Sequence, residues 1–342
     1  MQKKIIVLAI AAALTAPALA FAEATVYGQV NLAIERRDDG NSPSTTANQL
    51  NSYGSRFGLK GSEALDGGMS IVWMLEGGYK ADDGMSESTN QIFNRESHIG
   101  LTSDSMGTVT LGLQPTPYKA ATRRLDVFGD TAADNRGLLG DNHDESVANA
   151  FSYMTPSMGG FSVAVATQFG AEKSPQPVAP NNNTKGSALG LAAMYEQGPI
   201  YAAFAIDNVK YGAANTGQLA GVVDAESKGL MLGGSYSMDA ITISAEIERL
   251  TNKASATAAE LKNSNFYLGA KFALSSSDAI KAAYTKVGSQ TGLNNNATQV
   301  AVGYDHNMSK NTMVYALYTK ITQNATGAPD PSILSVGMKH AF

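Results

Sequence analysis

The last eleven residues of the chain read Ser332-Ile-Leu-Ser-Val-Gly-Met-Lys-His-Ala-Phe342. From Leu334 onward, mostly apolar side chains alternate with small or polar ones, which is the period-2 pattern of a strand with one apolar face. A soluble protein rarely ends on an apolar strand with a bare edge, because such an edge pairs with other chains. A closed β-barrel in a bilayer has no edge, and aromatic residues such as Phe342 belong at its membrane boundary. The stretch therefore favours a membrane-embedded barrel.

The first 22 residues have the pattern of a cleaved secretory signal peptide. Lys3 and Lys4 form a positive start, residues 5–14 form an apolar core, and Ala-Phe-Ala at positions 20–22 fits a cleavage site. A permanent N-terminal anchor helix is the alternative, but the apolar run is short for a membrane span. We expect residues 1–22 to be removed and residues 23–342 to form one barrel domain.

The composition fits strands with one wet face. Only 16% of the residues are charged, glycine is abundant at 34 residues, and the net charge of −5 becomes −7 once Lys3 and Lys4 are removed. This acidic balance gives no support to nucleic-acid binding. Beyond residue 22 the sequence contains no apolar run near 20 residues, so we expect no membrane-spanning helix. A soluble β-solenoid or a pair of β-sandwiches is the competing fold class.

Short and long connections alternate along the chain, and this alternation distinguishes a membrane barrel from a soluble β-solenoid or a pair of β-sandwiches. Seven short stretches of turn formers can reverse the chain between antiparallel strands: 64–68, 103–107, 156–160, 197–199, 238–239, 275–278 and 307–311. Eight polar connections are longer: 38–51, 81–91, 115–145, 171–186, 212–227, 251–264, 291–296 and 323–331. Fifteen connections join sixteen strands, with short periplasmic turns and long external loops as in outer-membrane barrels. We predict an all-β fold, a 16-stranded antiparallel transmembrane β-barrel.

The strand faces indicate a water-filled interior. In the first strand the apolar parity runs from Val26 to Ile34 and the polar parity from Tyr27 to Glu35. Polar groups on the second face must meet water, and sixteen strands leave an aqueous lumen. The alternation is weak at residues 201–206 and 230–235, which we assign as strands by spacing.

Motifs across the chain resemble the trimeric general diffusion porins of Gram-negative bacteria, especially the β-proteobacterial type. They occur in the family's order: TVYGQVNL at 25–32, SRFGLKGSE at 55–63, NRESHIGL at 94–101, LGLQ at 111–114, LDVFGD at 125–130, PSMGGF at 156–161 and the terminal Phe342. The resemblance implies a homotrimer in outer-membrane lipid and lipopolysaccharide, with one pore per subunit for passive diffusion of ions and small hydrophilic solutes. It also implies that Phe342 is read by the barrel-assembly machinery, and it implies no cofactor.

The resemblance also assigns a pore constriction. The longest connection, residues 115–145, would be the third external loop and would fold into the lumen. By motif position, Asp126 and Asp130 are expected at the narrowest point, with Asp134 nearby. The opposing wall would carry the bases Arg56, Lys60 and Arg95, together with the carboxylate of Glu76.

One position departs from the family pattern. Family members commonly carry a third wall arginine at the start of the sixth strand, which corresponds here to Ser146 or Val147. Either Arg123, Arg124 or Arg136 supplies this charge from the loop, or the basic cluster is weaker. The sequence therefore leaves the ion preference open.

Strand four adds a prediction about neighbouring subunits. If Arg95 faces the lumen, Glu96 and His98 share the outward parity, and we expect Glu96 to contact another protomer, since a charge facing lipid is costly.

We predict no enzyme activity and no metal site. The four histidines are dispersed, and neither a metal-binding motif nor a nucleophile–base pair is visible. Two alternatives remain: a substrate-selective channel on the same barrel and, less favoured, an outer-membrane adhesin.

Overall fold

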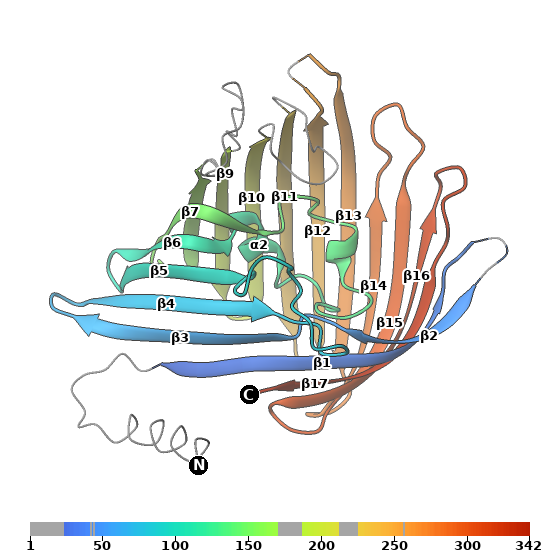
Figure 1. Cartoon of the computed structure of the whole chain (residues 1–342), viewed down its shortest axis with the longest axis horizontal. Helices are drawn as coiled ribbons and strands as arrows, with labels where there is room; N and C mark the ends of the chain where they lie inside the picture. The colour runs from blue at the N-terminus through green and yellow to red at the C-terminus, as the bar shows by residue number, and fades with distance from the viewer. Residues whose placement is uncertain (1–23, 42, 44, 170–186, 212–224, 256) are drawn as a thin grey trace, which may run out of the picture.

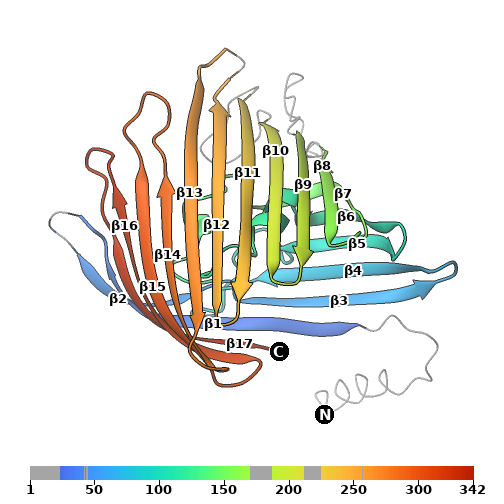
Figure 2. The ribbon, with the colours of Figure 1, turned by 180° about the vertical axis from the view of Figure 1, so that it is seen from behind.

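The chain forms one closed antiparallel sheet (Figures 1 and 2). The computed structural model describes residues 24–41, 43, 45–169, 187–211, 225–255 and 257–342. The predicted signal peptide, residues 1–22, therefore lies outside the described residues. The strands are β1 (Thr25–Asp38), β2 (Thr46–Ser52), β3 (Arg56–Leu65), β4 (Met69–Gly78), β5 (Glu96–Ser103), β6 (Gly107–Pro115), β7 (Ser146–Met154), β8 (Phe161–Gln168), β9 (Ser187–Gln197), β10 (Ile200–Tyr211), β11 (Ala225–Met238), β12 (Ile241–Lys253), β13 (Glu260–Ala273), β14 (Asp278–Val287), β15 (Ala297–Asn307), β16 (Thr312–Gln323) and β17 (Ser332–Ala341).

The last strand closes the barrel by pairing with the first, as predicted. The register of β1 with β17 runs from Gln29 opposite Ala341 to Asp38 opposite Ser332. Beyond it, the amides of Gly28 and Phe342 each donate to the other's carbonyl, at 3.0 and 3.1 Å. Glycine is required at position 28, because a Cβ there would lie 2.7 Å from the backbone carbonyl oxygen of Arg56 and 2.5 Å from the Phe342 ring. The bare edge inferred from the sequence is thus paired.

Seventeen strands occupy sixteen positions in the wall. Both β2 and β3 pair with β1: β2 with residues 32–38 and β3 with residues 25–29. Residues 53–55, including Gly54 at φ +60°, interrupt what is otherwise one strand. The predicted count of sixteen is confirmed, but the expected first loop at 38–51 was too long, because residues 46–52 are strand.

The short turns fall where the sequence placed them, and each joins two neighbouring strands. The predicted loop at 251–264 was too long, because β12 continues to Lys253 and β13 begins at Glu260. The weakly alternating segments at 201–206 and 230–235 do lie in β10 and β11. Among the described residues, no helix is long and apolar enough to cross a membrane.

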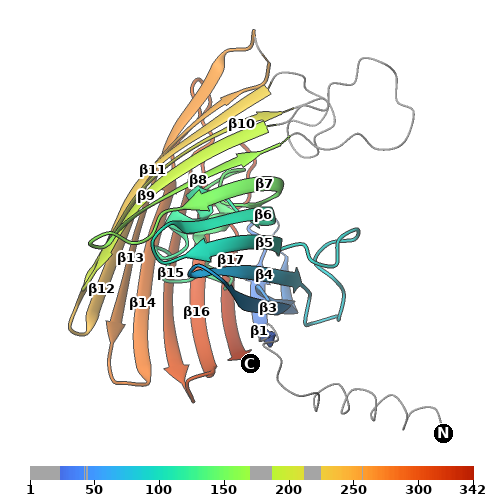
Figure 3. The ribbon, with the colours of Figure 1, turned by 90° about the vertical axis from the view of Figure 1, so that its left-hand side faces the viewer.

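Side chains alternate between an apolar outer face and a small or polar inner face. In β17, Leu334, Val336 and Met338 are exposed to the outside, whereas Ser335 is completely buried. In β1, Ile34 is exposed on the outside and Glu35 is buried on the inside. Figure 3 shows β3–β7 on one side of the barrel and β11–β14 on the other.

Strand β5 contradicts the prediction for Glu96. Arg95 precedes the strand, so the regular alternation starts only at Glu96. Glu96 lies directly opposite the inward-facing Glu76, and opposite residues of an antiparallel pair share one face. Glu96 and His98 therefore face the lumen, and Ile99 faces outward with 54% of its surface exposed. Because Glu96 faces the lumen, it does not lie on the outer surface that could contact another protomer, and the prediction of such a contact was wrong.

The connection between β6 and β7, residues 116–145, lies against the inner wall. It begins with the helix α2 (Pro117–Thr122), which is capped by the Thr116 side chain accepting from the Lys119 amide. Figure 1 shows α2 within the ring of strands, and its contacts are mainly with β9 and β10. A short 3₁₀ turn, η1, follows at Asn135–Gly137. We call this segment the third loop.

Candidate functional site

The third loop meets the barrel wall at a salt bridge between Arg56 and Asp130. Arg56 begins β3 on the inner parity, and its Nη1 lies 3.1 Å from Oδ2 of Asp130. The approach is close because Gly54 has no side chain: a Cβ there would lie 2.7 Å from Oδ1 of Asp130. The Asp130 carbonyl also accepts from the Asn31 side chain at 2.7 Å. The loop tip is thus held against β1 and β3.

Two loop arginines approach the same carboxylate. Arg136 Nη2 lies 3.0 Å from Asp130, and Arg123 Nη2 lies 3.9 Å from it. Burial alone would raise the pKa of Asp130, but the guanidinium groups of Arg56, Arg136 and Arg123 hold it below its ordinary value. Asp134 pairs with Arg136 and accepts from the Asp130 amide. The Asp130 carboxylate is therefore shared by arginines from both the wall and the loop.

A second group of charges lies beside the first on the wall. Glu76 of β4 accepts from Arg95 Nε at 2.8 Å and from the Tyr27 hydroxyl at 2.8 Å. It is also 3.9 Å from Arg56 Nε, which links the two groups. Arg95 reaches Glu87 of the preceding loop at 3.6 Å. Wall and loop charges thus form one continuous network.

The bases of this network are more exposed than most of its acids. The side chains of Arg56, Arg95, Arg123 and Arg136 are 20–29% exposed. Those of Glu76, Asp130 and Asp134 are only 9–12% exposed, and only Glu87, at 31%, is as open. Water and ions in the lumen therefore meet guanidinium groups more than carboxylates.

Three predicted site residues lie outside this network. Arg124 turns away from its neighbour Arg123 to pair with Glu196 of β9. Asp126 makes no ion pair with the network, although it lines a polar hollow together with Arg123, Asp130 and Arg136; its carboxylate accepts from the Tyr267 hydroxyl of β13 at 3.1 Å. Lys60 lies over the Tyr27 ring at 4.9 Å, further along β3 towards the turn.

Lys119 is a base of the third loop that was not among the predicted site residues. It sits in α2, and its Nζ lies 3.1 Å from the hydroxyl of Ser146, one of the two positions where the family arginine was expected. The pKa of Lys119 is lowered to about 8, mainly by burial; Asp144 opposes this shift and nearby arginines add to it. Lys119 follows the capping residue Thr116 by three positions, and this spacing could have suggested that it lies in a short helix where the loop leaves the wall.

The opposite side of the third loop is anchored by buried hydrogen bonds. Tyr118 donates to Glu248 of β12 at 2.6 Å, and Glu248 also accepts from the Gly140 amide. His143 contacts Asp207 at 2.9 Å and Ser227 at 3.0 Å. These contacts fix both ends of the loop.

The Ser227, His143 and Asp207 contacts have the order of a catalytic triad but not its chemistry. The Ser227 hydroxyl donates its hydrogen bond to the Asn252 side chain at 2.5 Å. Activation of a serine nucleophile would require this hydroxyl to donate to the imidazole instead. Ser227 and His143 are also completely buried, which leaves no path for a substrate. In the described part of the chain, no cluster of three or more His, Cys, Asp or Glu residues could hold a metal ion.

A closed barrel with an apolar outside, a polar inside and a charged internal loop defines an outer-membrane channel. A family model described as Gram-negative porin matches residues 8–326. The chain therefore belongs to the Gram-negative porin family, and it is an outer-membrane channel for passive diffusion.

Relatives and solved structures agree with this assignment. Outer membrane porin protein 32 of Delftia acidovorans is 27% identical over 92% of this chain and 88% of its own length. An outer membrane porin protein of Bordetella pertussis is 26% identical over 84% of this chain and 82% of its own length. The anion-selective porin from Comamonas acidovorans has a similar fold, with a TM-score of 0.80 at 23% identity over 94% of this chain and 100% of that one.

Proposed function

We propose that Arg56, Arg95, Arg123 and Arg136, with Asp130 and Glu76 behind them, form the pore constriction and give the channel a weak preference for small anions. The greater exposure of the guanidinium groups carries this proposal. An ion in the aqueous lumen, between protein walls of low dielectric constant, interacts most strongly with the nearest charges, and salt screens the more distant ones. The anion-selective porin with a similar fold supports the same direction.

The mechanism is passive passage of hydrophilic solutes. The paired arginines and carboxylates orient the water beside them, so an apolar solute must displace bound water and is disfavoured. Conduction requires binding weak enough for release. No cofactor or catalytic step is part of this proposal.

Reconstitution in a planar bilayer under a salt gradient tests the constriction. The wild-type reversal potential should indicate anion preference, and the double reversal Arg56→Glu with Arg95→Glu should shift it towards cations. The double variant Lys310→Glu with Lys320→Glu carries the same charge change outside the lumen and should leave it unchanged. An unchanged potential in the arginine variant would refute the placement.

We further propose that the channel works as a homotrimer with one pore per subunit. A solved trimer of an outer membrane protein from Vibrio cholerae, with a TM-score of 0.68 and 15% identity, has a similar fold. Three equal conductance steps per insertion event are expected. Steps that always occur singly would contradict the trimer.

Phe342 is proposed to be recognised by the barrel-assembly machinery. Its backbone completes the pairing with Gly28, and the residue lies near the turn at 307–311 with 52% of its surface exposed. Deletion of Phe342 should lower the yield of folded barrel in cells while leaving the conductance of the barrels that form unchanged. A normal yield would refute this role.

A further inference from the structure

Glu96 is a carboxylate of the lumen wall that the arginine network does not use. It lies opposite Glu76 at the start of β5, and its side chain is 25% exposed. Within the described ranges, no lysine or arginine lies within 4.0 Å of its carboxylate. The nearest basic atom is Nδ1 of His98, which at 3.6 Å is beyond hydrogen-bond distance. Glu96 therefore presents an open acceptor to the lumen.

Arg123 is a base of the third loop that lacks a close acid. Its Nη2 lies 3.9 Å from Asp130, whereas Arg56 and Arg136 approach that carboxylate to 3.1 and 3.0 Å. The hydrogen bonds to the Asp130 side chain come from these two arginines, and in the described part of the chain the Arg123 guanidinium donates none. Arg123 also lines the polar hollow of the loop, which measures about 220 Å³. Its donors thus remain free for a solute.

Lys119 places these two groups in the same section of the lumen. It is within electrostatic range of both Glu96 and Arg123. Arg95 and Arg56 are within the same range of Glu96. An anion drawn towards these bases is therefore repelled by Glu96, and a cation drawn towards Glu96 is repelled by the bases around it.

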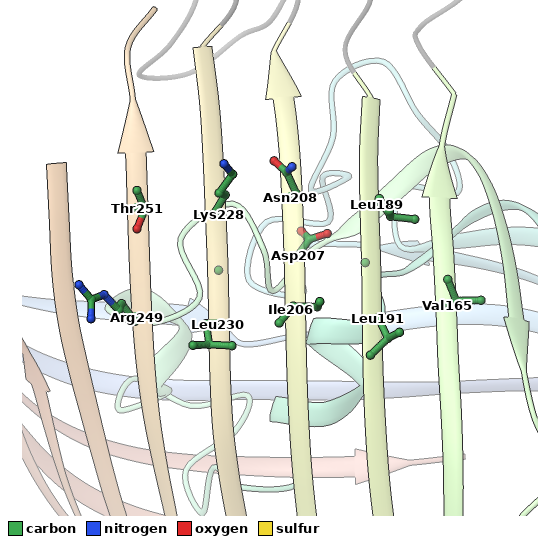
Figure 4. Close-up of a pocket in the computed structure, with 12 residues that line it drawn as sticks. Val165, Leu189, Leu191, Ile206, Asp207, Asn208, Lys228, Leu230, Arg249 and Thr251 are labelled. Atoms are coloured by element: carbon green, nitrogen blue, oxygen red, sulfur yellow. The ribbon is translucent and has the colours of Figure 1, made fainter. Parts of the chain in front are cut away.

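The wall formed by β10–β12 offers no such pair of charges. Its bases lie on the outer face, and Figure 4 shows Lys228 and Arg249 beside the outward-facing Leu230. Its inward carboxylates are at most 4% exposed: Asp207, Glu246 and Glu248. Among the described residues of these three strands, no open charge of either sign faces the lumen.

We propose that Glu96 gives the channel a preference for zwitterionic solutes, such as amino acids, over neutral solutes of the same size. The solute turns its carboxylate towards the arginine group, where Arg123 has free donors, and its ammonium group towards Glu96. Because a zwitterion carries both charges, it is attracted at both ends, whereas a simple ion is attracted at one and repelled at the other. This proposal rests on the arginine group of the proposed constriction and adds a solute class to it.

Glu145 is the competing acceptor for the ammonium group. It is an exposed residue at the end of the third loop, and no base lies within 4.0 Å of its carboxylate in the described ranges. Glu96 is favoured because β5 places it directly opposite Glu76, which accepts from Arg95 and so belongs to the arginine network.

Swelling of liposomes that contain the purified full-length barrel tests the proposal at neutral pH. Serine is compared with glyceramide, a neutral molecule in which a hydroxyl and an amide replace the ammonium and carboxylate groups. Protein-free liposomes give the background rate. The wild-type serine rate should exceed the glyceramide rate by about two- to fivefold, the range expected for partly exposed ion pairs. Glu96→Gln should bring this ratio close to one.

Four further variants control for folding and for total charge. Glu96→Asp keeps the carboxylate and should retain most of the preference. Glu260→Gln removes an exposed carboxylate from the outer parity of β13 and should leave the ratio unchanged. Arg123→Gln should lower the ratio, whereas Arg124→Gln should lower it much less, because Arg124 pairs with Glu196.

A wild-type ratio near one, or an unchanged ratio in Glu96→Gln, would overturn the proposal. A ratio lost in Glu145→Gln and kept in Glu96→Gln would assign the ammonium group to the end of the loop instead.

The reversal potential separates this test from that of the constriction. An anion-selective wild type whose Glu96→Gln variant keeps the serine preference refutes only the role of Glu96. A channel without anion preference whose serine preference still depends on Glu96 refutes only the ion preference assigned to the constriction.

Discussion

The two sides of the third loop use opposite chemistry. Towards β3 and β4, the loop presents partly exposed charges, and Arg123 and Arg136 share Asp130 with Arg56. Towards β9–β16, it presents buried aromatic rings and hydrogen bonds, and Tyr118 and Phe128 have no exposed surface. One side of the loop is therefore buried against the wall, whereas the other side contacts the wall through charges that stay open to water.

This difference separates stability from transport. Exposed ion pairs contribute little to stability because water competes and salt screens them. Buried apolar contacts contribute much more, and they do so without placing charge in the path of an ion. We expect variants on the buried side, towards β9–β16, to change how firmly the loop is held, and variants on the open, charged side to change which ions pass.

The largest effect is expected from Phe128→Ala. Phe128 packs among Ala33, Ala133, Tyr315 and Leu317, so its removal should destabilise the docked loop by about 3–5 kcal/mol. The barrel itself should stay folded, since its strands pair independently of the ring. Faster proteolysis of the loop and noisier single-channel current should report the change.

The control for this prediction is Phe161→Ala, which removes the same ring from the outer face, where it is 60% exposed. Loop proteolysis should match wild type in this control. A Phe128→Ala loop as resistant as wild type would show that the charged side holds the loop.

The barrel was predictable because period-2 patterns and turn residues act locally. The alternation around Leu334 and the turn formers at 64–68 each specify structure within a few residues. The interruption between β2 and β3 at residues 53–55 could not be predicted in this way, because it depends on the approach of Asp130, which is distant in sequence, to Gly54. Glu96 was misplaced because the parity was counted from Arg95, which precedes β5.

The site was predictable only where a strand or a family motif placed the residue. Arg56 and Glu76 lie on the inner parity of regular strands and meet as expected. Loop residues have no such periodicity, so Arg123 and Arg124 could not be told apart although they face opposite ways. The pairing of Tyr118 with Glu248 spans 130 residues and has no local signal.

Arg123 and Arg124 offer an internal control for the open side. Arg123→Gln removes a cation from the group around Asp130 and should shift the reversal potential towards cations. Arg124→Gln removes the same charge from the pair with Glu196 and should shift it much less. Equal shifts would show that the total loop charge, and not the arginine group, sets the preference.

The smallest effect is expected from the titration of Lys119. Because burial lowers its pKa to about 8, this lysine is mostly charged at pH 7 and mostly neutral at pH 9. The neutral fraction should rise from about one-tenth to about nine-tenths over that interval. Losing a cation beside Ser146 should weaken the anion preference, so the reversal potential should drift towards cations as the pH rises.

Two substitutions isolate this titration from any other change between pH 7 and pH 9. Lys119→Arg keeps its charge throughout, so its reversal potential should stay constant. Lys119→Met has no charge at either pH, and its reversal potential should match wild type at pH 9. A drift that persists in both variants would assign the titration to another group and remove Lys119 from the charged side of the loop. If the drift is lost in both, an ammonium group on the loop contributes the basic charge that was expected from the wall.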